Sequence, residues 1–436
     1  MSVTRKPDAA GRSPRSAADL PGGPPVLVAA RGWFIALAVL VVAPWVVVAA
    51  MYLWSPEADP DTVAHRPPEV GERPASPGAW GQLALTPITI SPPLEYVAND
   101  WGRRPGAGAH WVFPNTSPES LDALLRAAGL APEAVARLRA TALPDPRIEG
   151  MVVRPDAELI GSLAPEVRAR LYLQLASTPL NFAHSNSFRF LGDSVEDWLG
   201  RSPISPETRT LLEPMIYRGG KVLHFADADW IRSRVTDAEE LRRVAKVLLR
   251  ARTVLVRLTI TDPTEVDRLT DYWGRGGRST DLRPLLESVA GGSDTRRIDI
   301  IHLLPAFARN RLYRYPKVTT GDLEKSLLAN CLWTSLNFFS AQPDDRYLDV
   351  NTALTALRND YYVVQSGLQL GDIVAFLDEE GDLFHAGVYI ADDLVFSKNG
   401  TSPVAPWALQ RVDELKEYYR VRSANPRLIY HRRNDF

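Results

Sequence analysis

The residues best suited to covalent chemistry are Cys331, the only cysteine in the chain, and His385, which follows it by 54 positions (385 − 331). A cysteine thiolate can attack an acyl carbon, and an imidazole can take the thiol proton and later return it to the leaving group. A third polar side chain holds the imidazole in the productive tautomer. The pair indicates nucleophilic cleavage of an acyl bond, although a cysteine without such context is more often buried and inert.

A helix is expected to present the cysteine. Leu332, Leu336 and Phe339 recur at i, i+4 and i+7, which is the spacing of one helical face. Cys331 then lies in the first turn, where free backbone N–H groups and the positive end of the helix dipole stabilise a thiolate. We therefore expect the pKa of the thiol to lie below the free value of ~8.5.

Short strands are expected to present the histidine. The apolar runs Ile373–Leu377 and Ala386–Ile390 flank Asp378–Asp382, which has the composition of a turn. A third run begins at Leu394, after another tight connection. The sequence predicts three antiparallel strands, with His385 at the start of the second and the cysteine helix packed across them.

This order of elements resembles the NlpC/P60-like family of papain-fold cysteine peptidases. The resemblance rests on the cysteine at a helix start, the Gly371-Asp372 step into a strand and the run His385-Ala-Gly-Val-Tyr389, and it extends from Asn330 to Tyr419. It implies a papain-like domain that hydrolyses amide bonds in peptidoglycan stem peptides, with Cys331 as nucleophile and the histidine as base. We interpret the aspartate of the Gly-Asp step as a turn cap rather than a catalyst.

The resemblance places the orienting residue on the strand after the histidine, where Ser397 and Asn399 are the candidates. We favour Asn399, because an amide carbonyl can accept a hydrogen bond from the imidazole N–H; a turn role before Gly400 explains this asparagine nearly as well. The cysteine context, Asn-Cys-Leu-Trp, departs from the family's Asp-Cys-Ser-Gly. Bulky Trp333 and polar Ser397 are the residues expected to contact substrate.

The composition excludes other classes of protein. A formal net charge of −2 argues against a nucleic-acid binder, and 45% hydrophobic with 23% charged residues is ordinary for a globular protein. A single cysteine excludes an intrachain disulfide, so an exported domain must be stable without one. We expect no metal and no cofactor, and the sequence leaves the oligomeric state open.

The N-terminal region predicts a membrane anchor. Residues 1–31 have the composition of a disordered tail, and residues 32–54 form an uncharged apolar run. About 23 helical residues span the ~30 Å hydrocarbon core. Five basic residues precede the run and three acidic residues follow it at once, so the positive-inside rule places the bulk of the chain outside the cytoplasm.

The rest of the chain divides into three regions by pattern. Residues 55–114 are dense in proline and glycine and predict a stalk, with one short strand at Leu83–Ile90. Residues 115–316 predict a mostly helical α+β body of unknown role, and Leu303–Pro316 is expected to pack that body on residues 317–436, the catalytic domain. The helices are expected at Pro118–Ala128, from Pro132, at Pro165–Ala176, after a capping box at Thr236–Glu239, at Pro263–Tyr272 and at Leu282–Val289, with a strand at Thr253–Ile260.

Three features of the body have alternative functional interpretations. His224, Asp227 and Asp229 could ligate a metal, but their spacing fits no standard zinc pattern, so we favour a solvated loop. His184 precedes the cysteine, which is the wrong order for the resemblance. The segment Gly274–Arg278 lacks the ending of a phosphate-binding loop and is interpreted as a plain loop.

The sequence as a whole predicts an α+β protein with one N-terminal transmembrane helix, a mostly helical middle body and a C-terminal papain-like domain. Its predicted function is that of a membrane-anchored thiol hydrolase of the cell envelope, acting on cell-wall peptides through Cys331, His385 and Asn399. Two alternatives remain open. One is a degenerate papain-like binding or scaffold protein, and the other is a transacylase or lipid-amide hydrolase.

Overall fold

The computed structural model describes residues 71–97, 109–292, 296–316, 329–400 and 405–435. The predicted tail over residues 1–31 and the predicted transmembrane helix over residues 32–54 lie outside these ranges. Within the ranges described, no helix is both long enough and apolar enough to cross a membrane.

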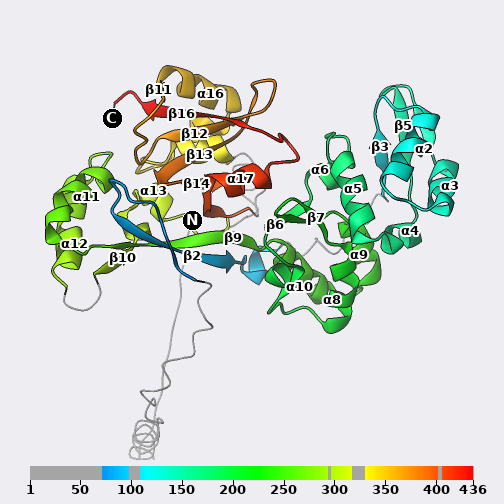
Figure 1. Cartoon of the computed structure of the whole chain (residues 1–436), viewed down its shortest axis with the longest axis horizontal. Coiled ribbons are helices and arrows are strands. Elements are labelled where there is room, and N and C mark those ends of the chain that lie inside the picture. The colour runs from blue at the N-terminus through cyan, green and yellow to red at the C-terminus, as the bar shows by residue number, and fades with distance from the viewer. Residues whose placement is uncertain (1–70, 98–108, 293–295, 317–328, 401–404, 436) are drawn as a thin grey trace, which may run out of the picture. The chain divides into compact units, whose positions relative to one another are not determined.

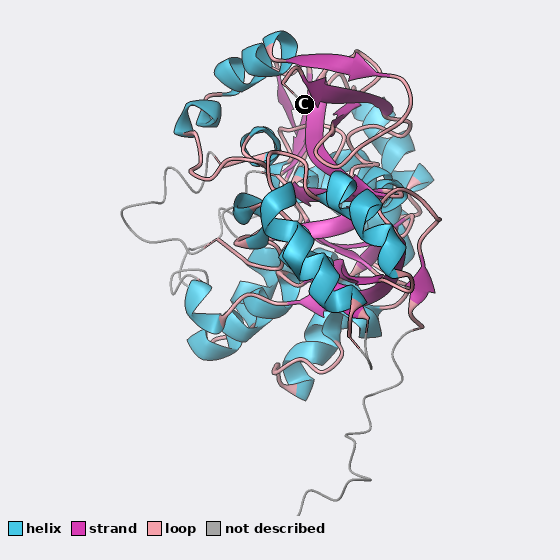
Figure 2. Ribbon diagram, turned by 90° about the vertical axis from the view of Figure 1, so that its left-hand side faces the viewer, coloured by secondary structure: helices cyan, strands magenta, loops and turns pink. Residues whose placement is uncertain are grey.

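The described chain is a mixture of helices and antiparallel sheets, so the α+β prediction is confirmed (Figures 1 and 2). The helices are α2 (Pro118–Ala127), α3 (Pro132–Ala140), α4 (Ala157–Ser162), α5 (Pro165–Leu175), α6 (Phe182–Ser185), α7 (Val195–Leu199), α8 (Pro206–Leu212), α9 (Ala228–Arg234), α10 (Ala238–Leu248), α11 (Val266–Trp273), α12 (Ser279–Ala290), α13 (Ala306–Arg309), α15 (Cys331–Leu336), α16 (Val350–Asn359) and α17 (Val412–Tyr418).

The strands of the described residues form four sheets. A six-stranded sheet has the order β11 (Tyr361–Val364), β16 (Arg427–Arg433), β12 (Ile373–Leu377), β13 (Leu383–Ala391), β14 (Leu394–Lys398) and β15 (Trp407–Arg411). A four-stranded sheet has the order β1 (Arg73–Pro74), β2 (Gln82–Ile90), β9 (Ala251–Thr259) and β10 (Arg297–Asp299). Two three-stranded sheets have the orders β3 (Trp111–Phe113), β5 (Gly150–Val153), β4 (Leu143–Asp145) and β6 (Phe188–Leu191), β8 (Val222–Phe225), β7 (Tyr217–Gly219).

The six-stranded sheet contains the predicted hairpins. β12 pairs with β13 and β13 with β14, both antiparallel, and a register shift follows Phe376 in the first pair. Residues on both faces of β13 are buried, because α15 packs on one face and the end of α17 on the other. In Figure 1, α16 lies next to β11 at one edge of this sheet, and α17 lies beside β14. Burial on both faces explains why these strands read as continuous apolar runs.

The four-stranded sheet corrects the predicted stalk. All nine residues of β2 pair with β9, and Leu83 and Leu85 are buried in a core that also holds Val256 and Leu258. Pro87 is tolerated within β2 because the opposite edge of this strand is paired only at the two residues of β1. The described part of the range 55–114 is therefore integrated into the folded body, and the strand predicted at Leu83–Ile90 forms.

Most of the helices predicted in the body form where expected. α2, α3 and α5 each begin at the predicted proline, and Ser117 caps α2 by accepting a hydrogen bond from the backbone of Ser120. The capping box predicted at Thr236–Glu239 does not form. Asp237, one residue later, is the N-cap of α10 and accepts from the backbone N–H of Glu239.

One core crosses the predicted boundary between residues 115–316 and 317–436. Residues 69–436 form one compact unit. The backbone N–H of Tyr313 donates to Trp407 O at 2.9 Å, so the segment Leu303–Pro316 packs on the C-terminal sheet as predicted. The hydroxyl of Tyr272 also donates to Ile390 O at 2.7 Å. These contacts connect the C-terminal sheet to elements 94 (407 − 313) and 118 positions earlier in the sequence.

The clearest hydrogen-bonded contact between the middle body and the C-terminal sheet lies between β9 and β15. The hydroxyl of Thr253, which is 1% exposed, donates to Leu409 O at 2.9 Å and accepts from Leu409 N at 3.0 Å.

Thr253→Val keeps the shape of the side chain but leaves a buried carbonyl and a buried N–H of Leu409 without partners. We expect a loss of about 1–3 kcal/mol in the free energy of unfolding of the full chain, measured by chemical denaturation. The matched control is Thr355→Val on the exposed face of α16. Equal stability of the two variants would show that the hydrogen bonds of Thr253 do not stabilise the fold.

Candidate active site

Cys331 is the first residue of α15, as the apolar spacing predicts. The N-cap is Asn330, whose side-chain oxygen accepts from the backbone N–H of Trp333 at 3.0 Å. An asparagine at this position favours helix initiation because it satisfies one of the free N–H groups of the first turn. α15 has only six residues, so its dipole contributes less than that of a long helix.

The thiol of Cys331 is buried rather than exposed to water. It packs in an apolar cluster with Leu336, Ile373 and Ala386. Burial raises the pKa of the thiol, while the neighbouring backbone N–H of Ala386 and the positive charge of Lys398 act in the opposite direction. The predicted depression of the pKa is therefore wrong for this conformation, because desolvation of the thiolate outweighs the favourable dipoles.

His385 lies on β13 with its side chain fully buried. The ring stacks on Tyr419 with a centroid separation of 4.5 Å and lies 5.4 Å from the ring of Phe376. Neither ring nitrogen has a hydrogen-bond partner among the described residues. Burial lowers the pKa of the imidazole to about 3, so the ring is neutral at physiological pH.

Cys331 and His385 lie on opposite faces of the sheet. Ala386 packs with Cys331 on the face covered by α15, whereas His385 pairs with Phe376 and packs with Tyr419 on the other face. Successive side chains of a strand point to opposite faces, so Ala386 and His385 cannot both face α15. The structure therefore does not form the predicted Cys331–His385 contact.

Asn399, the residue predicted to orient the imidazole, forms no hydrogen bond with His385. The amide nitrogen of Asn399 donates to the side chain of Gln410 at 2.7 Å, and Ser397 donates a long hydrogen bond of 3.4 Å to the amide oxygen of Asn399. A Cβ built on Gly387, next but one to His385, would approach Ser397 Cβ at 3.2 Å. Ser397 thus shares a sheet face with His385, while its hydroxyl contacts Asn399 rather than the imidazole.

The two predicted substrate-binding residues are also buried. Ser397 is 0% exposed and Trp333 is 6% exposed. The Trp333 ring packs edge-on against Phe307 at 5.2 Å and lies 5.3 Å from the guanidinium of Arg311. Neither Trp333 nor Ser397 offers surface to a substrate in this conformation, so the assignment of both to substrate binding is corrected.

Lys398 is the residue near the thiol that the sequence reasoning missed. It is the last residue of β14 and is 0% exposed. Its ammonium donates to Gly400 O at 3.2 Å and lies 6.0 Å from the ring of Trp407. The alternation Leu394, Phe396, Lys398 was the available signal, because it puts the lysine on the same face as two core residues.

Asp372 has the structural role predicted for it. Its carboxylate accepts from the backbone N–H of Gln369 at 2.8 Å, closing the turn before β12. It also accepts two hydrogen bonds of 2.8 Å from the guanidinium of Arg432 on β16. A bidentate ion pair with 1% and 13% exposed side chains fixes β16 beside β12.

The interpretation of His224 and Asp227 as parts of a solvated loop is wrong. His224 lies on β8, and Asp227 pairs with Arg168 and accepts from the hydroxyl of Tyr172 at 2.8 Å. His224 and Asp227 are both buried, and among the described residues no group of side chains could hold a metal ion. Burial raises the pKa of Asp227 to about 6, against the opposing charge of Arg168. His184, buried against Tyr172 at 4.5 Å, belongs to the same core.

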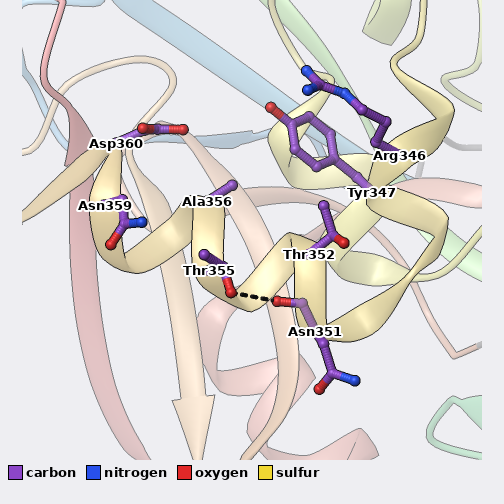
Figure 3. Close-up of a pocket in the computed structure, with 8 residues that line it drawn as sticks. All are labelled: Arg346, Tyr347, Asn351, Thr352, Thr355, Ala356, Asn359 and Asp360. Atoms are coloured by element: carbon purple, nitrogen blue, oxygen red, sulfur yellow. Dashed lines mark hydrogen bonds between the residues drawn. The ribbon is translucent and has the colours of Figure 1, made fainter.

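A pocket of about 380 Å³ lies away from these residues. It is lined by side chains of α16 and of the turn before it, between Arg346 and Asp360. Figure 3 shows Arg346 and Tyr347 approaching α16 from that turn, and the hydroxyl of Thr355 donating to Asn351 O at 2.8 Å. None of the candidate catalytic residues lines this pocket.

Comparisons with protein-family models, with curated proteins and with solved structures find no match to this chain.

The burial of a neutral imidazole predicts a pH-dependent contribution of His385 to stability. Its folded pKa of about 3 lies below the ordinary value of 6.5, so the unfolded chain binds a proton first as the pH falls. The stability that the neutral ring contributes is present above pH 6.5 and is lost progressively towards pH 3.

The corresponding experiment compares the full chain with His385→Gln by denaturation at pH 7.5 and pH 4.5. Relative to His385→Gln, the natural chain should lose about 1–3 kcal/mol of unfolding free energy between the two conditions. A difference that does not change with pH would show that the imidazole is not buried in neutral form.

Proposed function

We propose that this chain is a thiol-dependent hydrolase of amide bonds, with Cys331 as its nucleophile and cell-wall peptides as its substrate. The observation that carries the proposal is the position of the only thiol: it lies at the start of a capped helix that packs across the central strand β13 of an antiparallel sheet. The order of helix, Gly-Asp turn and His-containing strand, which resembles NlpC/P60-like peptidases, supports the same chemistry.

A nucleophilic role fits the surroundings of the thiol better than simple packing. Apolar packing alone requires no charge, yet a buried lysine with a polar link to the next loop lies near Cys331. Burying an ammonium is costly unless it is compensated. A buried cation beside a thiol favours the thiolate at the moment when a proton leaves, which is what a nucleophile needs.

The envelope location is a further part of the proposal. Residues 32–54 would anchor the chain and place residues 57–436 outside the cytoplasm, where cell-wall peptides occur. A reporter enzyme active only in the cytoplasm, fused after Phe436, should then be silent. An active reporter would overturn this location.

A binding or scaffold protein is the second candidate. The observation that favours it is the closure of the site: His385 and Ser397 are fully buried, and His385 does not contact the thiol. A protein of this kind would retain whole peptides without cleaving them. A hydrolase would return two pieces, one with a new amine and one with a new carboxylate.

The deciding experiment is a digest of purified peptidoglycan peptides with the full chain, followed by mass spectrometry. We expect cleaved products from the natural chain and at least about a thousandfold slower cleavage by Cys331→Ala, because the nucleophile is removed. Unfolding curves of the two proteins serve as the control for folding. Retention of intact peptides by both proteins would support the binding alternative and overturn the hydrolase.

A further inference from the structure

Lys398 and Cys331 meet on the same face of the sheet. β13 and β14 pair with Val388 opposite Phe396, and continuing this register by two residues brings Ala386 opposite Lys398. Ala386 packs directly against Cys331 in the cluster beneath α15. Cross-strand partners share a face, so Lys398 lies on the thiol side of the sheet, whereas His385 lies on the other side.

The position of the Lys398 ammonium is fixed by its neighbours. It donates to Gly400 O at 3.2 Å and lies over the Trp407 ring at 6.0 Å. The indole N–H of Trp407 in turn donates to the hydroxyl of Thr334 at 3.1 Å, one turn after Cys331 on α15. The lysine is thus linked through one aromatic ring to the helix that presents the thiol.

Tyr419 and Arg311 also lie in the surroundings of this pair. Tyr419 feels the charge of Cys331, and burial raises the pKa of its hydroxyl well above the usual value. The guanidinium of Arg311 lies 5.6 Å from the Trp407 ring. Burial lowers the pKa of Lys398 to about 8, with the charge of Cys331 acting in the opposite direction. The attraction between the thiolate and the ammonium acts against the cost that burial places on the charged form of each group, and it favours proton transfer within the pair.

We propose that Lys398, rather than His385, is the proton acceptor of Cys331, an inference that rests on the proposed hydrolase function. The neutral amine of Lys398 takes the thiol proton, and the thiolate attacks the amide carbon to form a C–S bond. The resulting ammonium gives its proton to the amide nitrogen as the C–N bond breaks and the amine leaves.

The second half of the reaction returns every group to its starting state. The amine of Lys398 takes a proton from water while the oxygen adds to the thioester carbon. The C–S bond then breaks, a carboxylic acid leaves, and the ammonium returns its proton to the Cys331 thiolate. No oxidant, metal or cofactor enters the balance. A lysine amine with a lowered pKa can fill this role.

The test measures the rate of Cys331 alkylation by iodoacetamide against pH in the full chain, which has no other thiol. Lys398→Met removes the charge and the proton acceptor while keeping an unbranched side chain. We expect alkylation at pH 8 to fall about tenfold or more, because loss of the neighbouring cation shifts the thiol pKa upward by about one unit or more. Lys221→Met, at an exposed lysine, is the matched control.

Two further variants separate the electrostatic effect of Lys398 from its role as proton acceptor and test whether His385 takes part. Lys398→Arg keeps the positive charge but cannot accept a proton, so alkylation should stay near the natural rate while peptide cleavage is lost. His385→Gln should leave the alkylation curve unchanged. Unfolding curves identify any variant that fails to fold, and Lys398→Gln replaces Lys398→Met in that case.

The outcomes distinguish this inference from the function on which it rests. Superimposable alkylation curves for the natural chain and the neutral Lys398 variant would overturn the inference, even if the natural chain cleaves peptides through Cys331. Loss of alkylation in His385→Gln, or full cleavage activity in Lys398→Arg, would also overturn it. A Lys398-dependent alkylation curve in a chain that cleaves no peptide would support the pair and reject the hydrolase.

Discussion

The alternation of side chains along β13 is the constraint on which the rest of the site depends. Ala386 and His385 are neighbours in sequence, yet one faces α15 and the other faces the end of α17. A strand offers no intermediate position, so a residue beside the thiol excludes its neighbour from the thiol. The pairing register of β12, β13 and β14 therefore decides which polar side chain lies on the same face of the sheet as Cys331.

Burial on both faces gives the site a second property. The thiol, the imidazole and the lysine are all withdrawn from water, and in each case desolvation shifts the pKa towards the neutral form. Burial therefore makes the charged form of each of these three groups costly. In the proposed reaction, charge separates between the two residues when a proton moves from Cys331 to Lys398. A proton acceptor whose pKa lies near the working pH is effective in this role.

Local signals were sufficient to predict much of this structure. The apolar spacing after Cys331 placed it in the first helical turn, and the turn composition of Asp378–Asp382 placed the β12–β13 hairpin. Sequence alone could not assign sheet faces, because Ile373–Leu377 is apolar throughout and carries no alternation. The proline content around Pro87 resembles that of a linker, although a strand with one edge paired at only two residues tolerates proline. The sequence does indicate that Lys398 shares a sheet face with the core residue Phe396, because the two residues are two positions apart on one strand.

The central claim is that the thiol of Cys331 faces Lys398 and not His385. A high-resolution crystal structure of the chain tests this most directly, through the distances from the Cys331 sulfur to the Lys398 ammonium and to the two His385 nitrogens. The account predicts that the ammonium is the nearer group and that the imidazole stacks on Tyr419. A hydrogen bond between the Cys331 sulfur and a His385 nitrogen would contradict it.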